Sequence, residues 1–378
     1  IYSNRTIMYY EHYIDFKWPK LDVFLDITTV CNAGCPMCHR TDRNGLGKVD
    51  WLPIIEWSIE DFKKAFPKNV CEVIRFWQFC GTFGDPMINK DIIEIVKYCK
   101  EIISLRNEKL NWKDSERGIH INTNGSLRDE DFWWDLGVAG GKELVVEFAV
   151  EGINQEMHEK YRQKTSLKKI LKNIETLSHT KALIETQTIV FKHNQDYLDE
   201  IEKMCIDYGS IRHKNIYTDR WGNKSPNHFE FIDSKGNKNI LEKAESKQKL
   251  HSRIIEKNEG IISESIRRRD DWFKKMKYWE EKEYNISCEW MNDNRLVINS
   301  DGNIIPCCYF ALPMTPPRHD KFNKIEVIKK YDNEEHNIFK KNLIDILKDS
   351  NWFNKHLPNS WEKNPTHVCK RFCGTIKK

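Results

Sequence analysis

The first 220 residues alternate between short apolar runs and amphipathic helical patterns. The apolar runs are four to nine residues long and rich in Val, Ile, Leu and Phe, as strands are. Strands are predicted at Leu21–Ile27, Val73–Gln78, Gly118–Asn122, Leu144–Ala149, Leu183–Phe191 and Asn215–Thr218. Helices are predicted at Ser58–Phe66, Lys90–Leu105, Asp129–Leu136, Gln155–Tyr161, Leu167–Leu177 and Gln195–Tyr208. Strands that alternate with helices pair in parallel through right-handed crossovers, so the pattern predicts an α/β fold with six βα units.

The last third of the chain has a different pattern. Residues 223–287 are rich in Lys, Glu, Asn and Ser, and we expect a helical insertion there. A solvated insertion is favoured over a lid on a substrate site, because charge-rich segments usually face water. Further along, two short apolar runs flank an Asp301-Gly302 turn, which predicts a hairpin.

Composition indicates a folded globular protein. Hydrophobic residues make up 39% of the 378, and 61 basic against 57 acidic side chains leave a net charge of +4. So balanced a charge does not favour a nucleic-acid partner. The sequence has no run of 18 apolar residues and no signal-peptide layout, so we expect a cytoplasmic protein without a membrane segment. In a reducing compartment, the 12 cysteines are expected to be thiolate ligands rather than disulfides.

Three cysteines follow the first predicted strand, in TTVCNAGCPMCHR: Cys31, Cys35 and Cys38. Three thiolates within eight residues can hold three irons of a [4Fe–4S] cluster and leave the fourth iron open for chemistry. The alternative is a structural zinc site with His39 as the fourth ligand. Such sites usually pair two short motifs across a gap, which disfavours zinc here.

The C-x3-C-x2-C spacing resembles the signature of the radical S-adenosylmethionine (SAM) superfamily, with Met37 where an aromatic residue usually stands. The resemblance implies a partial (β/α)6 barrel of the TIM type over residues 20–222, after an N-terminal extension at 1–19. In such barrels the site lies at the carboxyl ends of the strands. The resemblance also implies that SAM is cleaved with an electron from an external reductant such as flavodoxin or ferredoxin. The resulting 5′-deoxyadenosyl radical abstracts hydrogen from a substrate.

Two later turns match positions that bind SAM in this superfamily. Phe83, Gly84 and Asp85 in GTFGDP resemble its Gly-Gly-Glu-Pro element, which receives the ammonium group of SAM. An ordinary βα turn is the alternative, because Gly-Asp-Pro is common turn chemistry. Asn122 and Asn124 belong to a turn that is similar to the Thr-Asn-Gly turn of many members.

The next two positions are less typical of the superfamily. Glu151 in FAVEG stands in a motif like Ser-x-Asp-Gly, but Ala149 replaces the serine that contacts the ribose. Glu151 is the candidate to bind the ribose hydroxyls instead, and an ordinary surface glutamate is the equal alternative. Arg162 matches an arginine that binds the SAM carboxylate, and a cation at a helix end is its alternative.

A second cysteine group lies near the C-terminus. The spacing C-x13-G-x4-C, from Cys288 through Gly302 to Cys307, resembles the opening of a SPASM or twitch domain, which adds auxiliary clusters to radical SAM barrels. With Cys369 and Cys373, the count fits one more [4Fe–4S] cluster in a twitch domain at 288–378. A zinc ribbon on the same four cysteines is the alternative. Cys308 is left over as either a packing residue or a hydrogen-atom donor to a substrate radical.

Three functions are compatible with these features. The first is a radical SAM enzyme that modifies a peptide or protein side chain, as many proteins with such auxiliary domains do. The second is a dehydrogenase or rearrangement enzyme for a sugar-like or nucleotide small molecule. The third is a non-catalytic module that binds an iron–sulfur cluster or zinc.

Overall fold

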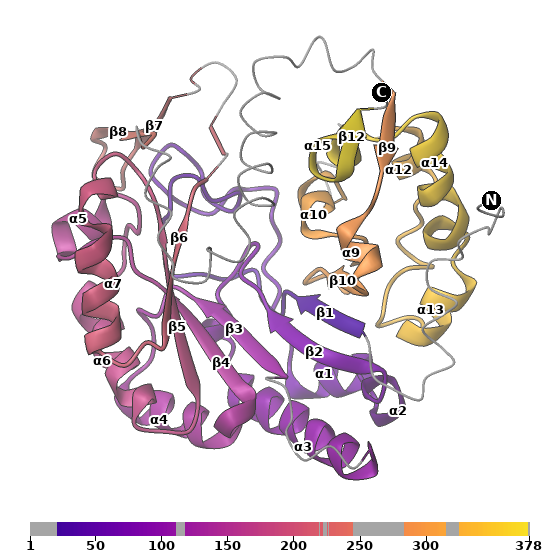
Figure 1. The fold of residues 1–378 in the computed structure, drawn as a ribbon, viewed down its shortest axis with the longest axis horizontal. Coiled ribbons are helices and arrows are strands. Elements are labelled where there is room, and N and C mark those ends of the chain that lie inside the picture. The colour runs from indigo at the N-terminus through magenta and orange to yellow at the C-terminus, as the bar shows by residue number, and fades with distance from the viewer. Residues whose placement is uncertain are drawn as a thin grey trace.

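The structure is a computed structural model that describes residues 21–110, 118–218, 220, 221, 225, 227–244, 283–314 and 325–376. Its centre is a curved eight-stranded sheet with the order β11-β10-β1-β2-β3-β4-β5-β6 (Figure 1). Six strands lie side by side in chain order and all pair in parallel. These are β1 (Leu21–Leu25), β2 (Ile74–Phe79), β3 (Ile119–Thr123), β4 (Leu144–Ala149), β5 (Leu183–Ile189) and β6 (Arg212–Ile216).

The observed strands confirm the predicted α/β fold and its partial barrel. Within the described residues, β6 pairs only with β5 and β11 only with β10, so the sheet is not closed. The sixth strand starts three residues before the predicted Asn215–Thr218 and ends at Ile216. Its Arg212 and Lys214 side chains form ion pairs with carboxylates of β4 and β5, so the strand carries charges that concealed it in the sequence.

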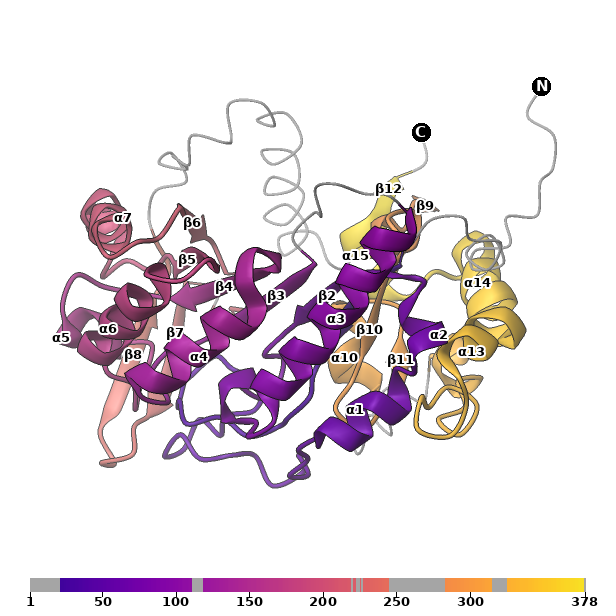
Figure 2. The same ribbon diagram turned by 90° about the horizontal axis from the view of Figure 1, so that it is seen from below.

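Helices cover the outer face of the sheet, and α3 and α4 lie across it when the molecule is seen from below (Figures 1 and 2). They are α1 (Ile59–Ala65), α2 (Lys68–Cys71), α3 (Ile92–Leu110), α4 (Glu130–Gly140), α5 (Gln155–Glu159), α6 (Leu167–Ser178) and α7 (Leu198–Asp207), with 3-10 turns η2 (Pro86–Ile88), η3 (Gly141–Glu143) and η4 (Gln195–Tyr197). A capping box begins α1, where Ser58 and Asp61 exchange backbone-to-side-chain hydrogen bonds of 3.0 and 2.9 Å. No helix in the described part of the chain is both long and apolar enough to cross a membrane.

The C-terminal segment extends the barrel sheet. Strand β10 (Arg295–Ile298) pairs in parallel with β1, and β11 (Ile304–Ile305) pairs antiparallel with β10. The predicted hairpin is therefore confirmed, with Gly302 at a φ of 85° in its turn. A second small sheet joins β9 (Tyr284–Ile286) to β12 (Gly374–Ile376). The helices of this segment are α9 (Glu289–Asn292), α10 (Cys308–Met314), α12 (Glu326–Lys329), α13 (Leu343–Asp349), the π-helical turn η6 (Trp352–His356), α14 (Leu357–Lys363) and α15 (His367–Cys373).

The helical insertion expected at 223–287 is wrong where the structure describes it. Residues 227–244 contain the strands β7 (His228–Ile232) and β8 (Lys238–Glu242), which form an antiparallel hairpin. Phe229 and Phe231 alternate along β7 and are 5% exposed each, as a strand with one buried face requires. The hairpin is therefore packed against the protein rather than solvated, and the helical pattern expected after residue 250 lies outside the described residues.

One hydrophobic core runs from the barrel into the C-terminal segment. Trp57, 2% exposed, lies at this junction, with its ring centroid 4.8 Å from that of Phe339. Its Nε1 donates a hydrogen bond of 2.7 Å to the carbonyl oxygen of Ser300, in the β10–β11 turn. This contact joins the loop after β1 to the C-terminal hairpin.

We expect the substitution Trp57→Phe to lower the free energy of unfolding by about 2–3 kcal/mol, because the smaller phenyl ring leaves a cavity and a buried hydrogen bond is lost. Urea denaturation followed by tryptophan fluorescence measures this. The matched control is Trp134→Phe, since Trp134 is 47% exposed and its change should stay within about 0.5 kcal/mol. Equal stabilities of the two variants would show that the Ser300 contact does not stabilise the junction.

Candidate functional site

The cysteine loop leaves the carboxyl end of β1 and folds tightly back on itself. Backbone hydrogen bonds run from the Cys38 amide to the Cys35 carbonyl, 3.1 Å, and from the Gly34 amide to the Gln163 carbonyl, 2.9 Å. Parallel strands place all their βα turns on one rim, so this loop lies with the turns that follow β2, β3 and β4. The structure thus brings together the turns that the sequence assigned to SAM.

Hydrogen-bond donors point at the sulfur atoms of this loop. The Ala33 amide and Asn124 Nδ2 lie 3.4 and 3.8 Å from Cys31 Sγ, and Arg162 Nη1 lies 3.5 Å from Cys35 Sγ. Burial raises the pKa of the Cys35 thiol to about 11, with Arg162 acting in the opposite direction. Donors aimed at sulfur suit thiolates that share an anionic iron–sulfur cluster, so the donor set fits such a group.

An apolar layer covers the cysteine loop. Met37, Tyr161 and Phe191 belong to it, together with the buried side chains Phe229 and Phe231 of the β7–β8 hairpin. The hairpin is fixed to the loop by backbone hydrogen bonds of 2.9 and 2.8 Å that involve both the amide and the carbonyl of Ile232. The first part of the charged insertion therefore shields the cysteines from water, which the sequence analysis did not foresee.

The GTFGDP turn packs directly against β1. A Cβ atom at Gly84 would lie 2.1 Å from the carbonyl oxygen of Thr28, so only glycine fits. Phe83 is 2% exposed. This close packing accounts for the glycine of the motif and places the backbone of residues 83–85 beside the cysteine loop, where the Asp85 amide donates a 2.8 Å hydrogen bond to the Val30 carbonyl.

The carboxylate of Asp85 is engaged inside the protein. It accepts hydrogen bonds from the amides of Met87 and Asn124, 3.0 and 2.8 Å, from Thr123 Oγ1, 2.9 Å, and from Asn124 Nδ2. Burial raises the pKa of this carboxyl group, and these hydrogen bonds oppose the rise. The oxygens of Asp85 already bind these donors inside the protein, and the contact of this turn with the SAM ammonium stays a prediction. Backbone carbonyls of the turn are the acceptors that remain for an ammonium group.

The two asparagines of the next turn have different positions. Asn124 Nδ2 contacts the cysteine loop, since it donates a 2.9 Å hydrogen bond to Asn32 Oδ1. Asn122 instead points to the inner wall of the barrel, where its Nδ2 donates a 2.7 Å hydrogen bond to Glu147 Oε1 and its Oδ1 accepts from Gln78. The structure therefore groups Asn124 with the cysteines and leaves Asn122 on the barrel wall.

The inner wall carries balanced charges. Lys214 Nζ binds the carboxylates of both Glu147 and Glu185, and Arg212 Nη2 lies 2.5 Å from Glu185 Oε2. Ligand atoms of His120, Glu147 and Glu185 lie within 4.8 Å of one another, as in a metal site. Because the lysine and arginine already neutralise these carboxylates, and burial lowers the pKa of His120, the group needs no metal cation.

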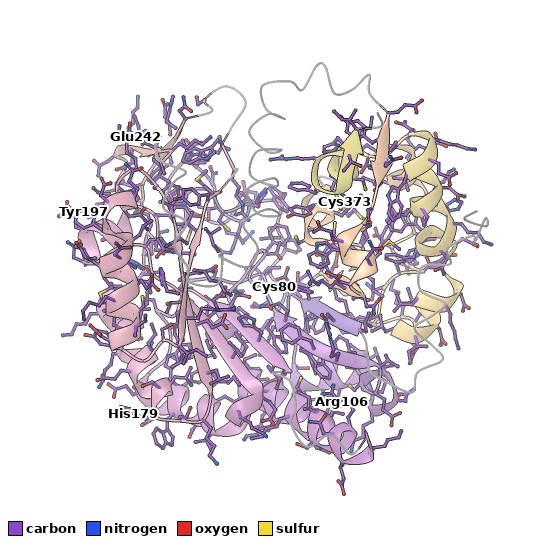
Figure 3. All side chains as sticks on the ribbon, viewed as in Figure 1. Cys80, Arg106, His179, Tyr197, Glu242 and Cys373 are labelled. Carbon is purple, nitrogen blue, oxygen red and sulfur yellow. The ribbon has the colours of Figure 1, made fainter. Side chains whose placement is uncertain are left out.

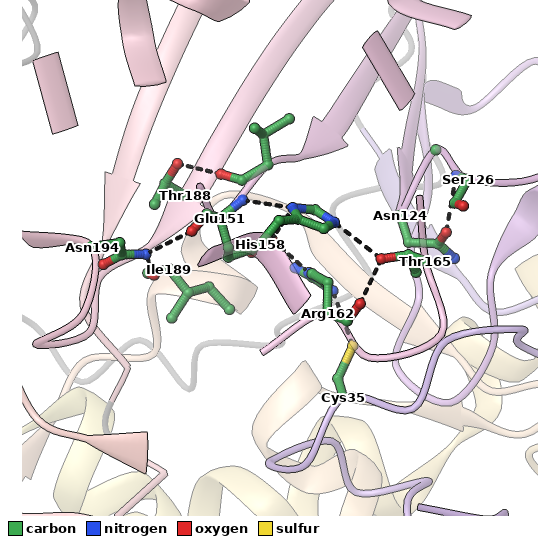
Figure 4. A network of polar contacts seen from close by, with 12 residues as sticks. Cys35, Asn124, Ser126, Glu151, His158, Arg162, Thr165, Thr188, Ile189 and Asn194 are labelled. Atoms are coloured by element: carbon green, nitrogen blue, oxygen red, sulfur yellow. Dashed lines mark hydrogen bonds and ion pairs between the residues drawn. The ribbon is translucent and has the colours of Figure 1, made fainter. Parts of the chain in front are cut away.

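Glu151 and Arg162 form a buried ion pair beside the cysteine loop (Figure 4). Arg162 Nε donates a 2.9 Å hydrogen bond to Glu151 Oε2, and Glu151 is 0% exposed. Glu151 is thus a buried residue rather than a surface glutamate, and its contact with the ribose stays a prediction. Arg162 has the expected place near the cysteines, and its partner Glu151 is not visible in the sequence.

The four C-terminal cysteines lie together. Strands β9 and β12 bring Cys288 to Cys373, whose carbonyl accepts a 3.0 Å hydrogen bond from the Ser287 amide. Cys369 and Cys373 are one turn apart on α15, and Cys307 interacts electrostatically with both Cys288 and Cys369. The side chains of Cys288 and Cys373 also share a hydrogen bond, so the four thiols form one group that is suited to hold either a cluster or zinc.

Cys308 lies apart from this group. Its electrostatic neighbours are Arg220 and Asp26, and Arg220 Nη1 in turn lies 3.4 Å from the Met37 carbonyl of the cysteine loop. Cys308 is exposed, in contrast to the buried Cys307. Cys80, which also interacts with Asp26 and Cys308, lies between the barrel strands and the C-terminal segment (Figure 3). Cys308 therefore has Cys307 as a neighbour on one side and Arg220, Asp26 and Cys80, near the cysteine loop, on the other.

Asp26 is a residue that the sequence analysis missed. It follows β1 and is 1% exposed, with Oδ1 accepting a 3.1 Å hydrogen bond from the Thr82 amide and Oδ2 buried without a partner. Burial raises its pKa to about 7. An acidic residue within an otherwise apolar strand pattern was the signal that could have marked it.

We expect Asp26→Asn to stabilise the protein at pH 8 by about 2–4 kcal/mol, and not at pH 4. In the folded state Asp26 keeps its proton up to pH of about 7, whereas the unfolded state loses it from about 3.8, so the native carboxyl group lowers stability progressively across that window. Urea unfolding at several pH values measures this, with the exposed Asp207→Asn as the control. A stability gain that is the same at pH 4 and pH 8 would contradict the raised pKa.

Comparisons with known proteins agree with this arrangement. Residues 25–205 match the model of the Radical SAM superfamily. The chain is 24% identical over 355 residues to GTP 3′,8-cyclase of Helicobacter pylori (strain ATCC 700392 / 26695), which covers 92% of this chain and 94% of the relative.

Two solved structures share the fold. Streptococcus suis SuiB bound to S-adenosylmethionine has a TM-score of 0.52 and 13% identity, covering 89% of this chain and 67% of SuiB. The protein anSMEcpe with bound AdoMet has a TM-score of 0.51 and 15% identity, covering 94% of this chain and 85% of that protein. The matched family segment contains the cysteine loop and every turn of the SAM rim described above. Residues 25–205, which hold the cysteine loop and the rim turns, therefore form a domain of the Radical SAM superfamily.

Proposed function

We propose that this enzyme uses a radical derived from SAM to modify a peptide or protein side chain. The observation that carries the proposal is the rim at the carboxyl ends of β1 to β4. It gathers three cysteine thiols and hydrogen-bond donors that point at two of their sulfur atoms. One of these donors is the guanidinium group of Arg162, which contacts Cys35 Sγ. When a reduced cluster binds SAM, that pair supplies methionine and a 5′-deoxyadenosyl radical.

Each residue of the rim has a distinct task in this proposal. Cys31, Cys35 and Cys38 would hold three irons, and Asn124 orients the loop through Asn32. Arg162 Nη2 makes no hydrogen bond within the described part of the chain, and the side chain is 15% exposed, so Nη2 is available to the SAM carboxylate. The ammonium group of SAM would bind the backbone of residues 83–85.

A second cluster is proposed at Cys288, Cys307, Cys369 and Cys373, which makes the C-terminal segment a twitch domain. The clustering of these four cysteines supports it. Four protein ligands close such a cluster, so it would supply electron transfer rather than substrate binding. An external reductant such as flavodoxin or ferredoxin would supply the electron for SAM cleavage.

Two observations support a peptide substrate. SuiB, which shares the fold, has been solved with its precursor peptide SuiA. On the inner wall of the barrel, Lys214 and Arg212 also form ion pairs with buried carboxylates. Their charges are therefore already compensated and are not available to bind a triphosphate. The second candidate is rearrangement of a nucleotide, which the similarity to GTP 3′,8-cyclase over nearly both full lengths favours.

Deuterium transfer distinguishes the two candidates. Cells are grown on deuterated medium, and their extract is divided into a macromolecular and a small-molecule fraction. The reconstituted enzyme is incubated with SAM, dithionite and one of these fractions. A separate incubation contains GTP in place of the extract. Deuterium in 5′-deoxyadenosine with the macromolecular fraction supports the peptide substrate. Deuterium only with the small-molecule fraction, or a rearranged product from GTP, would overturn it in favour of the nucleotide.

We expect the reconstituted protein to contain about eight irons per chain, and the variant with Cys31, Cys35 and Cys38 all changed to Ala to contain about four. That variant should form no 5′-deoxyadenosine, because no cluster can then bind SAM. Iron analysis and chromatography of the products measure both. Cys71→Ala is the control, since Cys71 is buried in the core and should not affect iron content. A triple variant that still cleaves SAM would disprove the assignment of this cluster.

We propose that Cys308 donates a hydrogen atom to the substrate radical. Its S–H bond breaks as a C–H bond forms on the substrate, and the thiyl radical regains one electron from the external reductant and one proton. Asp26, an acid with a pKa of about 7, interacts electrostatically with Cys308 and is a suitable proton source.

The adjacent Cys307 and Cys308 give a matched pair of variants. Cys308→Ala should keep all of the iron and should cleave SAM, because Cys308 is exposed and lies apart from the four cysteines. Cys307→Ala should lose about four irons. In the iron-loaded protein, iodoacetamide should label Cys308 and not Cys307, as peptide mass spectrometry will show. If Cys308→Ala is the variant that loses iron, both the ligand choice and the donor role fail.

A further inference from the structure

Among the described residues, the carboxylate of Glu151 has a single charged partner. Its Oε2 binds Arg162 at 2.9 Å, and its Oε1 is buried without a hydrogen-bond partner (Figure 4). His158 Nδ1 lies 4.0 Å from Oε2, but burial lowers the pKa of His158 to about 3, so this histidine is neutral. A carboxylate with no exposed surface is retained as an ion only if a cation compensates it, and Arg162 is that cation.

Arg162 divides its nitrogens between two neighbours. Nε binds Glu151, Nη1 donates to Cys35 Sγ at 3.5 Å, and Nη2 is left for a ligand. An arginine side chain keeps its proton in proteins, and here Glu151 lies against it as a counter-charge. The guanidinium is therefore a permanent charge in contact with a cysteine of the cluster loop.

The backbone around this ion pair is fixed by further hydrogen bonds. The Glu151 amide donates to His158 Nδ1 at 3.2 Å, and the Glu151 carbonyl accepts from Asn194 Nδ2 at 3.2 Å. Thr165 Oγ1 donates to the Arg162 carbonyl and lies 3.0 Å from His158 Nε2. Both ends of the pair are thus held, and the guanidinium has one orientation.

We propose that Glu151 is a positioning residue that holds Arg162 against Cys35 and balances its charge. It thereby sets both the reduction potential of the cluster and the affinity of the enzyme for the carboxylate of SAM. A cation that donates to a cluster sulfur favours the reduced, more negative cluster, and a carboxylate behind that cation offsets the effect. The inference rests on the proposed assignment of Cys31, Cys35 and Cys38 to the cluster.

Two substitutions separate charge from position. Glu151→Gln keeps an oxygen that can accept from Nε and removes the negative charge, so we expect the midpoint potential to rise while SAM binds no more weakly. Glu151→Ala also removes the acceptor, so Arg162 loses its orientation and the Kd for SAM should increase about tenfold. The control is Glu185→Gln. Glu185 is 1% exposed and forms an ion pair with Arg212 on the barrel wall, so this variant also removes a buried carboxylate that pairs with an arginine. It should alter neither quantity.

The measurements are an EPR-monitored redox titration and SAM titration by calorimetry, on reconstituted protein whose iron has been counted. If Glu151→Ala fails to fold, the potential of the isosteric Glu151→Gln variant decides the matter. Unchanged potential and unchanged SAM affinity in variants with full iron would overturn this inference alone. Absence of the cluster from the unsubstituted protein, or its persistence without the three cysteines, would overturn the cluster assignment instead.

Discussion

The site depends on one buried carboxylate, that of Asp85. Its two oxygens accept hydrogen bonds from the turn after β2, through Met87, and from the turn after β3, through Thr123 and Asn124. Asn124 continues the chain of contacts to Asn32 in the cysteine loop. The side chains of Asp85 and Asn124 thus join three segments that are distant in the sequence. A carboxylate accepts this many donors better than a neutral group does, because hydrogen bonds to an ion are stronger.

Charge compensation follows the same principle at other places on the rim and wall. Buried carboxylates at Glu147, Glu151 and Glu185 each contact at least one cation. Pairs of this kind add little net stability, since both ions lose water on burial, but they fix geometry closely. In the barrel wall the pairs leave little net charge. Beside the cysteines, the pair leaves Arg162 Nη2 without a hydrogen bond among the described residues, as the proposed contact with the SAM carboxylate requires.

The sequence allowed the strands, the helix boundaries and the cysteine groups to be predicted, because these depend on local patterns. Ser58 and Asp61 form their capping box within four residues, and Gly302 occupies the turn that its φ requires. The rest depended on contacts between distant segments. The sequence around Glu151 is typical of a surface or ribose-binding residue. Only the fold shows that Arg162 forms an ion pair with it. Phe229 and Phe231 lie in a charged stretch, and only their contact with the cysteine loop shows that the stretch contains a hairpin. The burial of Asp26 and its hydrogen bond to the Thr82 amide likewise depend on a segment that is distant in the sequence.

The pairing of β10 with β1 also has a consequence for biosynthesis. One edge of β1 is covered by a strand that leaves the ribosome only after the six barrel strands have been made. Until then, the backbone donors and acceptors along that edge lack β10, and an uncovered edge strand can pair with another chain. The barrel half is therefore expected to pass through a long-lived nascent state, since non-local pairing of this kind is slow to form. The β10–β11 hairpin, which leads into Cys307, completes the sheet. The barrel sheet is therefore complete only after the segment with the second group of cysteines has been translated.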